Sequence, residues 1–225
     1  MAGVVVRRVD RPELRVLDEF AQYGVATVHE AQARTGLLAS YITPIYPGAH
    51  VSGSAVTVSA PPQDNLMVHV AIELCREGDV LVVSPTAPTD GAYLGELIAT
   101  ALQVRGVRGL VVDAGVRDVA ELRRMGFPVW AKCVSALGPL KEELGDVNVP
   151  IECAGQRVEP GDVVVADDDG VVIVPRSNAA SVLEASRVRA QKEVASRERY
   201  AAGELSLDVQ GLRAELASKG LRYVD

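Results

Sequence analysis

The sequence lacks the long apolar runs, the abundant aromatic residues and the basic stripes that mark several large classes of protein. No apolar run approaches the roughly 18 residues of a membrane-spanning helix. The short apolar run near the N-terminus precedes its charges, whereas a secretory signal has the reverse order and a longer apolar region. We therefore expect a cytoplasmic protein with no membrane partner.

The sequence also has few aromatic residues and few cysteines, and each scarcity excludes a class of protein. Aromatic residues make up 4% of the chain and the net charge is −7, so the sequence offers neither a stacking platform nor a basic surface, and we expect no nucleic-acid partner. Cys75, Cys133 and Cys153 are far apart, odd in number and outside any CxxC pair. This pattern excludes a disulfide framework, and we interpret the three residues as buried free thiols.

Hydrophobic residues are plentiful, at 48% of 225 residues, which is enough for the core of one large domain. Helical and strand patterns alternate from about residue 65 to 133, which is typical of parallel α/β units. The predicted helices are 65–75, 91–105 and 119–125, and the predicted strands are 80–83, 110–113 and 128–131.

The N-terminal part contains two more predicted helices and a strand. A helix is predicted over 10–24, and a second has a capping box from Thr27 to Glu30 and stops at Gly36. A strand follows over 51–58, where the internal glycine indicates a bulge.

The C-terminal part changes character. Short strands over 148–151, 161–165 and 170–175 predict a β-rich layer added to the α/β layer. Helical stretches over 176–202 and 208–219 end the sequence, and the first is polar on most sides, which favours packing on another subunit. We expect one structural domain of class α/β, with a catalytic part over 1–175 and a helical extension over 176–225.

The most informative segment lies at the end of the 110–113 strand. A small-residue turn follows this strand and leads to Arg117 and Asp118, at a position where α/β proteins place chemistry. Arg117 offers a cationic fork for a carboxylate or enolate oxygen, and Asp118 offers a hard oxygen ligand for Mg²⁺ or Mn²⁺. Glu96 precedes Arg117 by 21 residues. We interpret this group as a site for metal-assisted carbonyl chemistry.

The same residues also have simpler interpretations. Arg117 and Asp118 can form a surface ion pair, with Asp118 capping the helix that follows. Glu96 can be an acid favoured by the dipole at a helix start. Asp113 is interpreted as a turn residue at a strand end. The alternative is an acid that supports the metal site without binding the metal directly. We assign structural roles to the other polar or aromatic candidates, which are His29, His50, His69, the Asp167–Asp169 turn and Trp130.

Several motifs resemble those of the RraA-like superfamily, and the resemblance extends from about Gly24 to the C-terminus. The motifs are Gly95-Glu96-Leu97, Arg105-Gly106-x-x-Gly109, Asp113-Ala114-Gly115-x-Arg117-Asp118 and Gly126-Phe127-Pro128-Val129. Segments 25–30, 161–170 and 220–225 further resemble the 4-hydroxy-4-methyl-2-oxoglutarate / 4-carboxy-4-hydroxy-2-oxoadipate aldolases. The resemblance implies a compact β/β/α sandwich of the swivelling-domain type. It also implies homotrimers or homohexamers with active sites between subunits.

The resemblance also implies residue roles. Asp118 would bind the metal, Mg²⁺ or Mn²⁺, directly, and Glu96 would contact it through water. Arg117 would bind the 2-oxo oxygen of the substrate and stabilise the pyruvate enolate. A neighbouring subunit would donate Glu193, with Glu198 and Glu204 as alternatives. Backbone N–H groups at the start of the 91–105 helix would bind the substrate C1 carboxylate, namely those of Gly95, Glu96, Leu97 and Ile98.

Two positions depart from the family pattern. Glu96 stands where these aldolases usually carry Asp, and Gly138-Pro139-Leu140 stands where a Gly-Thr-Val-like run is expected. The first departure weakens the substrate assignment more than the metal assignment. The second falls in a loop that we expect to shape the substrate pocket.

The implied function is a class II pyruvate aldolase of aromatic-acid catabolism, with oxaloacetate decarboxylation as an additional or main activity. A Schiff-base route needs an activated lysine, and none of the four lysines lies within 95–118, which favours the metal route. The alternatives are a related lyase on another branched hydroxy-oxo acid and a non-catalytic protein-binding regulator of ribonuclease E. Glu96 and the roughly 50 residues after Pro175 favour the enzyme.

Overall fold

The structure is a computed structural model that describes residues 3–225, and the chain divides into two compact units, Met1–Ser186 and Arg187–Asp225. The first unit is built on a mixed sheet with the strand order β1-β6-β5-β3-β2-β10-β11. Its parallel centre consists of β2 (Val51–Ala60), β3 (Asp79–Pro85), β5 (Gly109–Val116) and β6 (Val129–Val134). The antiparallel edge strands are β1 (Thr43–Pro44), β10 (Val163–Asp167) and β11 (Gly170–Val174).

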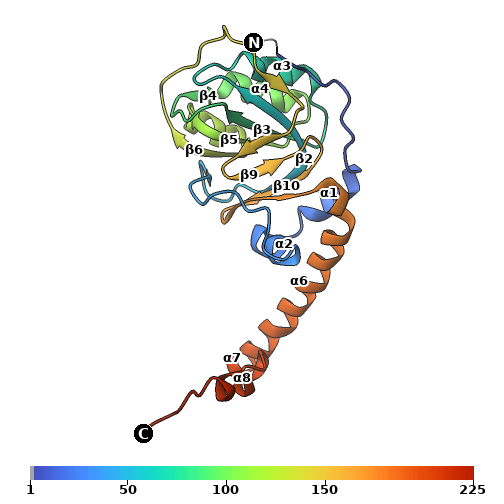
Figure 1. Ribbon diagram of the computed structural model, residues 1–225, viewed down its shortest axis with the longest axis vertical. Helices are drawn as coiled ribbons and strands as arrows, with labels where there is room; N and C mark the ends of the chain where they lie inside the picture. The colour runs from blue at the N-terminus through green and yellow to red at the C-terminus, as the bar shows by residue number, and fades with distance from the viewer. Residues whose placement is uncertain (1–2) are drawn as a thin grey trace. The chain divides into compact units, whose positions relative to one another are not determined.

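Both faces of the central strands are buried. Along β3, Leu81 and Val83 face one apolar cluster, and Val80 and Val82 face another, because successive side chains of a strand point to opposite faces. The first cluster lies under α3 (Leu66–Leu74), α4 (Glu96–Val104) and α5 (Val119–Met125), and the second under the hairpin β8 (Ile151–Cys153)–β9 (Gln156–Val158). Figure 1 shows α3 and α4 on one side of the sheet and β9 on the other. This layering confirms the predicted fold class.

A third apolar cluster lies on the β10–β11 hairpin. Helices α1 (Leu14–Phe20) and α2 (Val25–Ala31) and the first turns of α6 (Ala179–Ala201) pack there. A 3₁₀ turn, η1 (Arg176–Asn178), leads into α6. Because Val182 and Leu183 of α6 are buried in this cluster, the first unit extends to Ser186, beyond the division predicted at residue 175.

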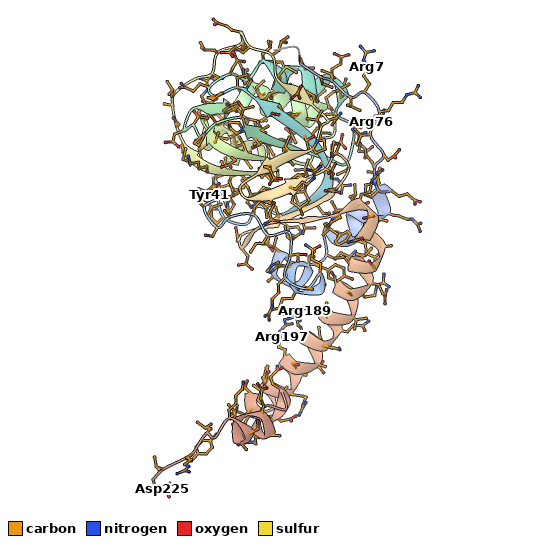
Figure 2. The ribbon with its side chains drawn as sticks, in the orientation of Figure 1. Arg7, Tyr41, Arg76, Arg189, Arg197 and Asp225 are labelled. Carbon is orange, nitrogen blue, oxygen red and sulfur yellow. The ribbon has the colours of Figure 1, made fainter. Side chains whose placement is uncertain are left out.

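The second unit comprises the rest of α6, α7 (Ser206–Val209) and α8 (Arg213–Ser218). The helix predicted over 208–219 is therefore interrupted, at a point where Gly211 has φ +66°. Charged side chains such as Arg189 and Arg197 cover α6 (Figure 2). Among the described residues, no helix is both long enough and apolar enough to cross a membrane.

The predicted helix over 91–105 is wrong at its start. Residues Ala92–Leu94 form a short strand, β4, which pairs in parallel with β5, and the helix begins only at Glu96. The three side chains are fully or almost fully buried. Burial beside β5 therefore overrides the helical spacing of the apolar residues, which continues without a break through this segment.

Three other local predictions also need correction. Helix α2 begins at Val25 rather than after Thr27, and its first N–H donates to Asp167 Oδ2 at 2.8 Å. Strand β2 keeps a regular register through Gly53, with no bulge. A Cβ at Gly53 would lie 2.6 Å from the Gly78 carbonyl oxygen, so close backbone approach explains this glycine. Of the strand predicted over 148–151, only Ile151 lies in a strand, β8, and residues 148–150 link β7 (Asp146–Val147), which pairs with β2, to the β8–β9 hairpin.

Asp167 provides the first test of this architecture. We expect Asp167→Ala to lower the free energy of unfolding by about 1 kcal/mol, as for loss of a helix-capping side chain. The carboxylate also accepts the N–H of Asp169 at 2.8 Å. Asp169→Ala is the matched control, because no hydrogen bond reaches the Asp169 carboxylate within residues 3–225. Urea unfolding of both variants makes the comparison, and equal midpoints would contradict the capping role.

Candidate active site

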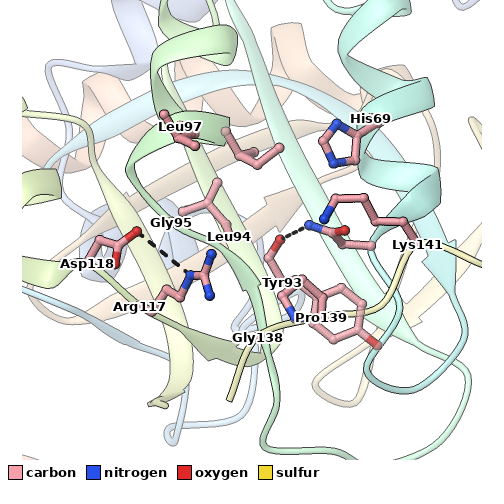
Figure 3. Close-up of a pocket in the computed structure, with 12 residues that line it drawn as sticks. His69, Tyr93, Leu94, Gly95, Leu97, Arg117, Asp118, Gly138, Pro139 and Lys141 are labelled. Atoms are coloured by element: carbon pink, nitrogen blue, oxygen red, sulfur yellow. Dashed lines mark hydrogen bonds and ion pairs between the residues drawn. The ribbon is translucent and has the colours of Figure 1, made fainter. Parts of the chain in front are cut away.

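A cavity of about 190 Å³ lies where β4 and β5 end and where α4 and α5 begin. Figure 3 shows Arg117 and Asp118 on one side of it and His69 and Lys141 on the other. Gly95, Leu97 and Ile98, three of the residues predicted to bind substrate, also line it. The structure therefore brings most of the predicted site together at the carboxyl ends of two parallel strands, as is typical of α/β proteins.

Backbone hydrogen bonds hold Arg117 and Asp118 at the end of β5. The N–H of Arg117 donates to the Leu94 carbonyl at 3.0 Å, which joins the ends of β4 and β5. Asp118 has φ +58°, an uncommon conformation for a residue other than glycine. Its Oδ2 accepts the N–H of Glu96 at 3.0 Å and lies 3.8 Å from Arg117 Nε. The carboxylate thus holds the start of α4, whereas the simpler interpretation placed it as a cap on α5, where it makes no capping bond.

Gly95 permits this close arrangement. A Cβ at this position would lie 2.2 Å from Asp118 Oδ2 and 3.1 Å from Arg117 Cγ. The backbone N–H groups of Leu97 and Ile98 follow in the first turn of α4, where helical geometry leaves such groups without intrahelical acceptors. They are therefore suitable donors for an anionic group in the cavity.

Replacing Gly95 tests how closely this corner is packed. We expect Gly95→Ala to reduce turnover in the aldolase reaction that the resemblance implies by roughly 10²-fold. The added methyl group displaces the Asp118 carboxylate, and reacting groups tolerate little misplacement. Val104→Ala, at an 83% exposed position near the end of the same helix, should leave turnover unchanged. Initial rates, with circular dichroism as the folding check, make the measurement. Full activity of the glycine variant would show that the carboxylate position is not critical.

Glu96 occupies the first turn of α4, but its side chain is not among those that line the cavity. Its Oε1 lies 3.5 Å from the Thr100 hydroxyl, one turn along the helix. Glu193 lies in the second unit, where it pairs with Arg189 at 3.0 Å. The roles that the resemblance implies for Glu96 and Glu193 stay predictions.

The opposite side of the cavity carries three polar residues to which the sequence alone assigned no catalytic role. Asn65 is 3% exposed, and its Nδ2 donates to the Tyr93 carbonyl at 2.9 Å, while its Oδ1 has no partner among the described residues. His69 also lines the cavity, and burial together with the charge of Lys141 lowers its pKa. Lys141 forms no ion pair within residues 3–225, and in Figure 3 its side chain extends toward the cavity.

The position of Lys141 corrects one argument from the sequence. A lysine route was disfavoured because no lysine lies within 95–118, yet Lys141 reaches the same cavity from the loop after β6. The loop brings Lys141 close in space to residues 95–118, although it is distant from them in the sequence. Gly138 and Pro139 of the same loop also line the cavity, and a Cβ at Gly138 would lie 2.8 Å from Arg117 Nη1. This is the loop where the sequence departs from the family pattern.

A divalent metal has one suitable ligand here. Asp118 uses Oδ2 for the Glu96 N–H, and no hydrogen bond or ion pair reaches its Oδ1 in the part of the chain that the structure describes. The same part contains no group of three or more His, Cys, Asp or Glu side chains arranged to hold a metal. Mg²⁺ commonly keeps several waters and binds one or two carboxylates together with substrate oxygens. The residues present therefore fit Mg²⁺ or Mn²⁺ and do not fit a metal enclosed by protein ligands.

Hydrogen bonds or burial account for the other candidates from the sequence. Asp113 Oδ2 accepts the N–H of Ala154 at 3.0 Å and the Tyr41 hydroxyl at 3.2 Å, and Asp113 does not line the Arg117 cavity. Asp168 accepts the Gly48 N–H at 2.9 Å, so the acidic turn is tied to a neighbouring loop. All three cysteines are free thiols, but only Cys75 and Cys153 are buried as predicted, whereas Cys133 is partly exposed. Burial raises the pKa of Cys75 to about 12.

Comparisons with known proteins agree with this architecture. The RraA-like family, described as Aldolase/RraA, matches residues 16–173. A protein of Halalkalibacterium halodurans named "Putative 4-hydroxy-4-methyl-2-oxoglutarate aldolase" is 29% identical over 92% of this chain and 97% of its own length.

Two solved structures are similar in both fold and sequence. An uncharacterised protein of Pseudomonas syringae has a TM-score of 0.78 and 25% identity, covering 89% of this chain and 99% of its own. Streptomyces coelicolor RraAS2, described as an unusual member of the RNase ES inhibitor RraA protein family, has a TM-score of 0.75 and 30% identity, covering 84% and 99%. With the family match spanning most of the first unit and these structures sharing its fold, the chain belongs to the RraA-like (Aldolase/RraA) family.

Proposed function

We propose that this protein is a divalent-metal-dependent aldolase that cleaves 4-hydroxy-2-oxo dicarboxylates or tricarboxylates and releases pyruvate. Its substrate would be 4-hydroxy-4-methyl-2-oxoglutarate, 4-carboxy-4-hydroxy-2-oxoadipate or both. The observation that supports this most is the composition of one cavity, which has Arg117, Asp118 and the first turn of α4 on one side and Lys141 on the other. The name of the Halalkalibacterium relative is in accord with it.

The first side suits the reacting half of such a substrate. The N–H groups of Leu97 and Ile98 bind the C1 carboxylate. The guanidinium of Arg117 donates hydrogen bonds to the 2-oxo oxygen and stabilises the negative charge that develops there as the C3–C4 bond breaks. Asp118 would hold Mg²⁺ or Mn²⁺, which when bound would supply Lewis-acid polarisation of the carbonyl.

Proton transfer is the proposed task of the acidic residues. The proton of the C4 hydroxyl passes through water to Glu96, whose carboxylate must first turn from Thr100 toward the cavity. A second acid, Glu193, comes from a neighbouring subunit of a homotrimer or homohexamer. When the C3–C4 bond breaks, the C4 fragment leaves as a 2-oxo acid, and return of the proton through water to C3 of the enolate gives pyruvate.

The second side suits the other half of the substrate. Lys141 is a cation without an ion-pair partner in the described chain, and it pairs with the distal carboxylate. Asn65 lies on the same side of the cavity, and its buried Oδ1 is an acceptor without a donor among the described residues. Oxaloacetate also carries a second carboxylate, so its decarboxylation through the same enolate is a compatible activity.

The direct test measures pyruvate release from 4-hydroxy-4-methyl-2-oxoglutarate with Mg²⁺ and then with excess EDTA, with oxaloacetate in parallel. We expect cleavage that stops with EDTA. Activity on oxaloacetate alone would identify a decarboxylase on this scaffold instead. Borohydride added with pyruvate should trap no adduct at Lys141, because trapping would establish the Schiff-base route.

The similarity to Streptomyces RraAS2 favours one second candidate, a protein that inhibits a ribonuclease by contact. Such a role makes no demand on Arg117 or on Lys141 in the cavity. Absence of turnover on both substrates, with Mg²⁺ or Mn²⁺ present, would shift the assignment to this candidate.

A further inference from the structure

Asp64, just before α3, is a buried carboxylate with an unusual number of backbone partners. It is 2% exposed, and its Oδ1 accepts the N–H of Leu66 at 2.9 Å. Its Oδ2 accepts the N–H groups of Glu142 at 2.6 Å and Glu143 at 3.0 Å. Burial alone raises the pKa of Asp64, but these three donors and the charge of Lys141 outweigh it, so the pKa lies below its ordinary value. One ionised side chain therefore joins the start of α3 to the loop that carries Lys141.

Backbone bonds join the same two segments on the other side of Lys141. The N–H of Leu140 donates to the Gln63 carbonyl at 2.7 Å, and the N–H of Asn65 donates to the Leu140 carbonyl at 3.0 Å. Lys141 thus lies between two attachment points, Leu140 and Glu142. Both lead back to residues 63–65, which also carry the cavity residue Asn65.

Apolar burial contributes little to holding this loop. Its large apolar side chains, Leu137, Leu140 and Leu144, are 56%, 55% and 58% exposed. A loop that buries so little apolar area depends on hydrogen bonds for its conformation. The strongest of these are the charge-assisted bonds to Asp64, because an ionised acceptor forms hydrogen bonds about twice as strong as a neutral one does.

We propose that Asp64 is a positioning residue that sets Lys141 in place for the distal carboxylate of the substrate. The inference rests on the proposed function, because that function assigns the carboxylate to Lys141. Asp64 touches no substrate itself. It acts through the backbone of residues 142 and 143, which holds the Lys141 side chain on the cavity side of the loop.

The test is a double-mutant cycle with Asp64→Asn, Lys141→Met and the two combined, assayed with 4-hydroxy-4-methyl-2-oxoglutarate. We expect each single variant to raise KM about tenfold with kcat little changed, the pattern of a lost contact that ground and transition states share. The double variant should match Lys141→Met alone, because a residue that acts through Lys141 has no effect once the cation is gone.

Asp162 supplies a matched control for the loss of a buried carboxylate. It is 5% exposed and accepts two backbone N–H groups, of Glu159 at 2.9 Å and Arg176 at 2.8 Å, outside the cavity. Asp162→Asn should lower thermal stability as Asp64→Asn does, but should leave KM unchanged. A KM increase shared by both variants would assign the effect to general destabilisation and overturn the inference.

A second pair of variants tests the hydrogen bonds to Asp64 by changing the loop instead of Asp64. These variants are needed if Asp64→Asn does not fold. Glu142→Pro removes the N–H that makes the 2.6 Å bond, and Glu142→Ala keeps it. We expect the proline variant to raise KM like Asp64→Asn, and the alanine variant to behave like the wild type.

The possible failures are distinguishable. If the wild type turns over the substrate and Lys141→Met leaves KM unchanged, the proposed carboxylate contact is wrong, and the inference is overturned with it. If Lys141→Met raises KM but Asp64→Asn and Glu142→Pro do not, only the positioning role is overturned. Additive effects in the double variant would also overturn it, because they mean that Asp64 acts independently of Lys141.

Discussion

Replacing Arg117 by alanine is expected to reduce kcat/KM for the hydroxy-oxo acid by about 10³-fold, because removal of one preorganised donor at a developing oxyanion costs factors of 10² to 10³ and this donor is also charged. The side chain is 45% exposed and its ion pair to Asp118 spans 3.8 Å. The fold therefore depends little on it, and the melting temperature should stay close to that of the wild type. Steady-state kinetics and thermal unfolding of the same preparation make the measurement.

Arg124→Ala is the control for Arg117→Ala. Arg124 lies on α5 beside the site, is 72% exposed and makes an ion pair of similar length, 3.8 Å, to Glu121. Its loss should leave turnover unchanged. Equal activity of the two variants would contradict the proposed role of Arg117. A regulator that acts by protein contact would not require Arg117 for binding, so an inactive protein whose partner binding survives Arg117→Ala would support that candidate.

The second large effect is expected at Asp118. Asp118→Asn keeps an acceptor for the N–H of Glu96 but removes the charge that we propose holds the metal. We expect turnover to fall by a factor on the order of 10² to 10³, since a Lewis acid contributes several kcal/mol to such reactions. The Mn²⁺ concentration for half-maximal activation should rise, and Mn²⁺ bound at equilibrium, followed by electron paramagnetic resonance, should fall.

Glu121→Gln is the matched control for Asp118→Asn. Glu121 lies in the first turn of α5, which follows Asp118, and its side chain is 42% exposed against 40% for Asp118. It makes no contact with the N–H of Glu96 and does not line the cavity. If Asp118→Asn binds Mn²⁺ and turns over substrate as well as Glu121→Gln does, Asp118 is not the metal ligand.

The fold class follows from local patterns in the sequence. Val80–Val83 and Leu110–Val112 are short apolar runs bounded by turn residues, and the helical spacing between them predicts a parallel α/β arrangement. The same reasoning failed at Ala92–Leu94, where apolar residues at helical spacing form a strand. Periodicity cannot distinguish a buried helix turn from a buried strand of three residues, and pairing with β5 decides between them.

The two sides of the cavity differ in how far the sequence predicted them. Arg117 and Asp118 are adjacent in the chain, and Gly95 and Glu96 belong to a recognisable motif, so their proximity was predictable. His69 and Lys141 lie on different segments without a motif to connect them. The available hint in the sequence was Asp64, an acid just before a predicted helix. Its hydrogen-bond partners, Glu142 and Glu143, are far away in the sequence, so the hint could not connect the two segments.

The sequence by itself determined the alternating α/β framework, the RraA-like family and the Arg117–Asp118 side of the candidate site. These depend on residues close together in the chain, where spacing carries the information. The tertiary structure alone decided that Asp118 holds the start of α4, that Gly95 must lack a side chain, and that Lys141 shares the cavity. These features depend on contacts between distant segments, and such contacts form only when strand pairing and the Asp64 hydrogen bonds bring those segments together.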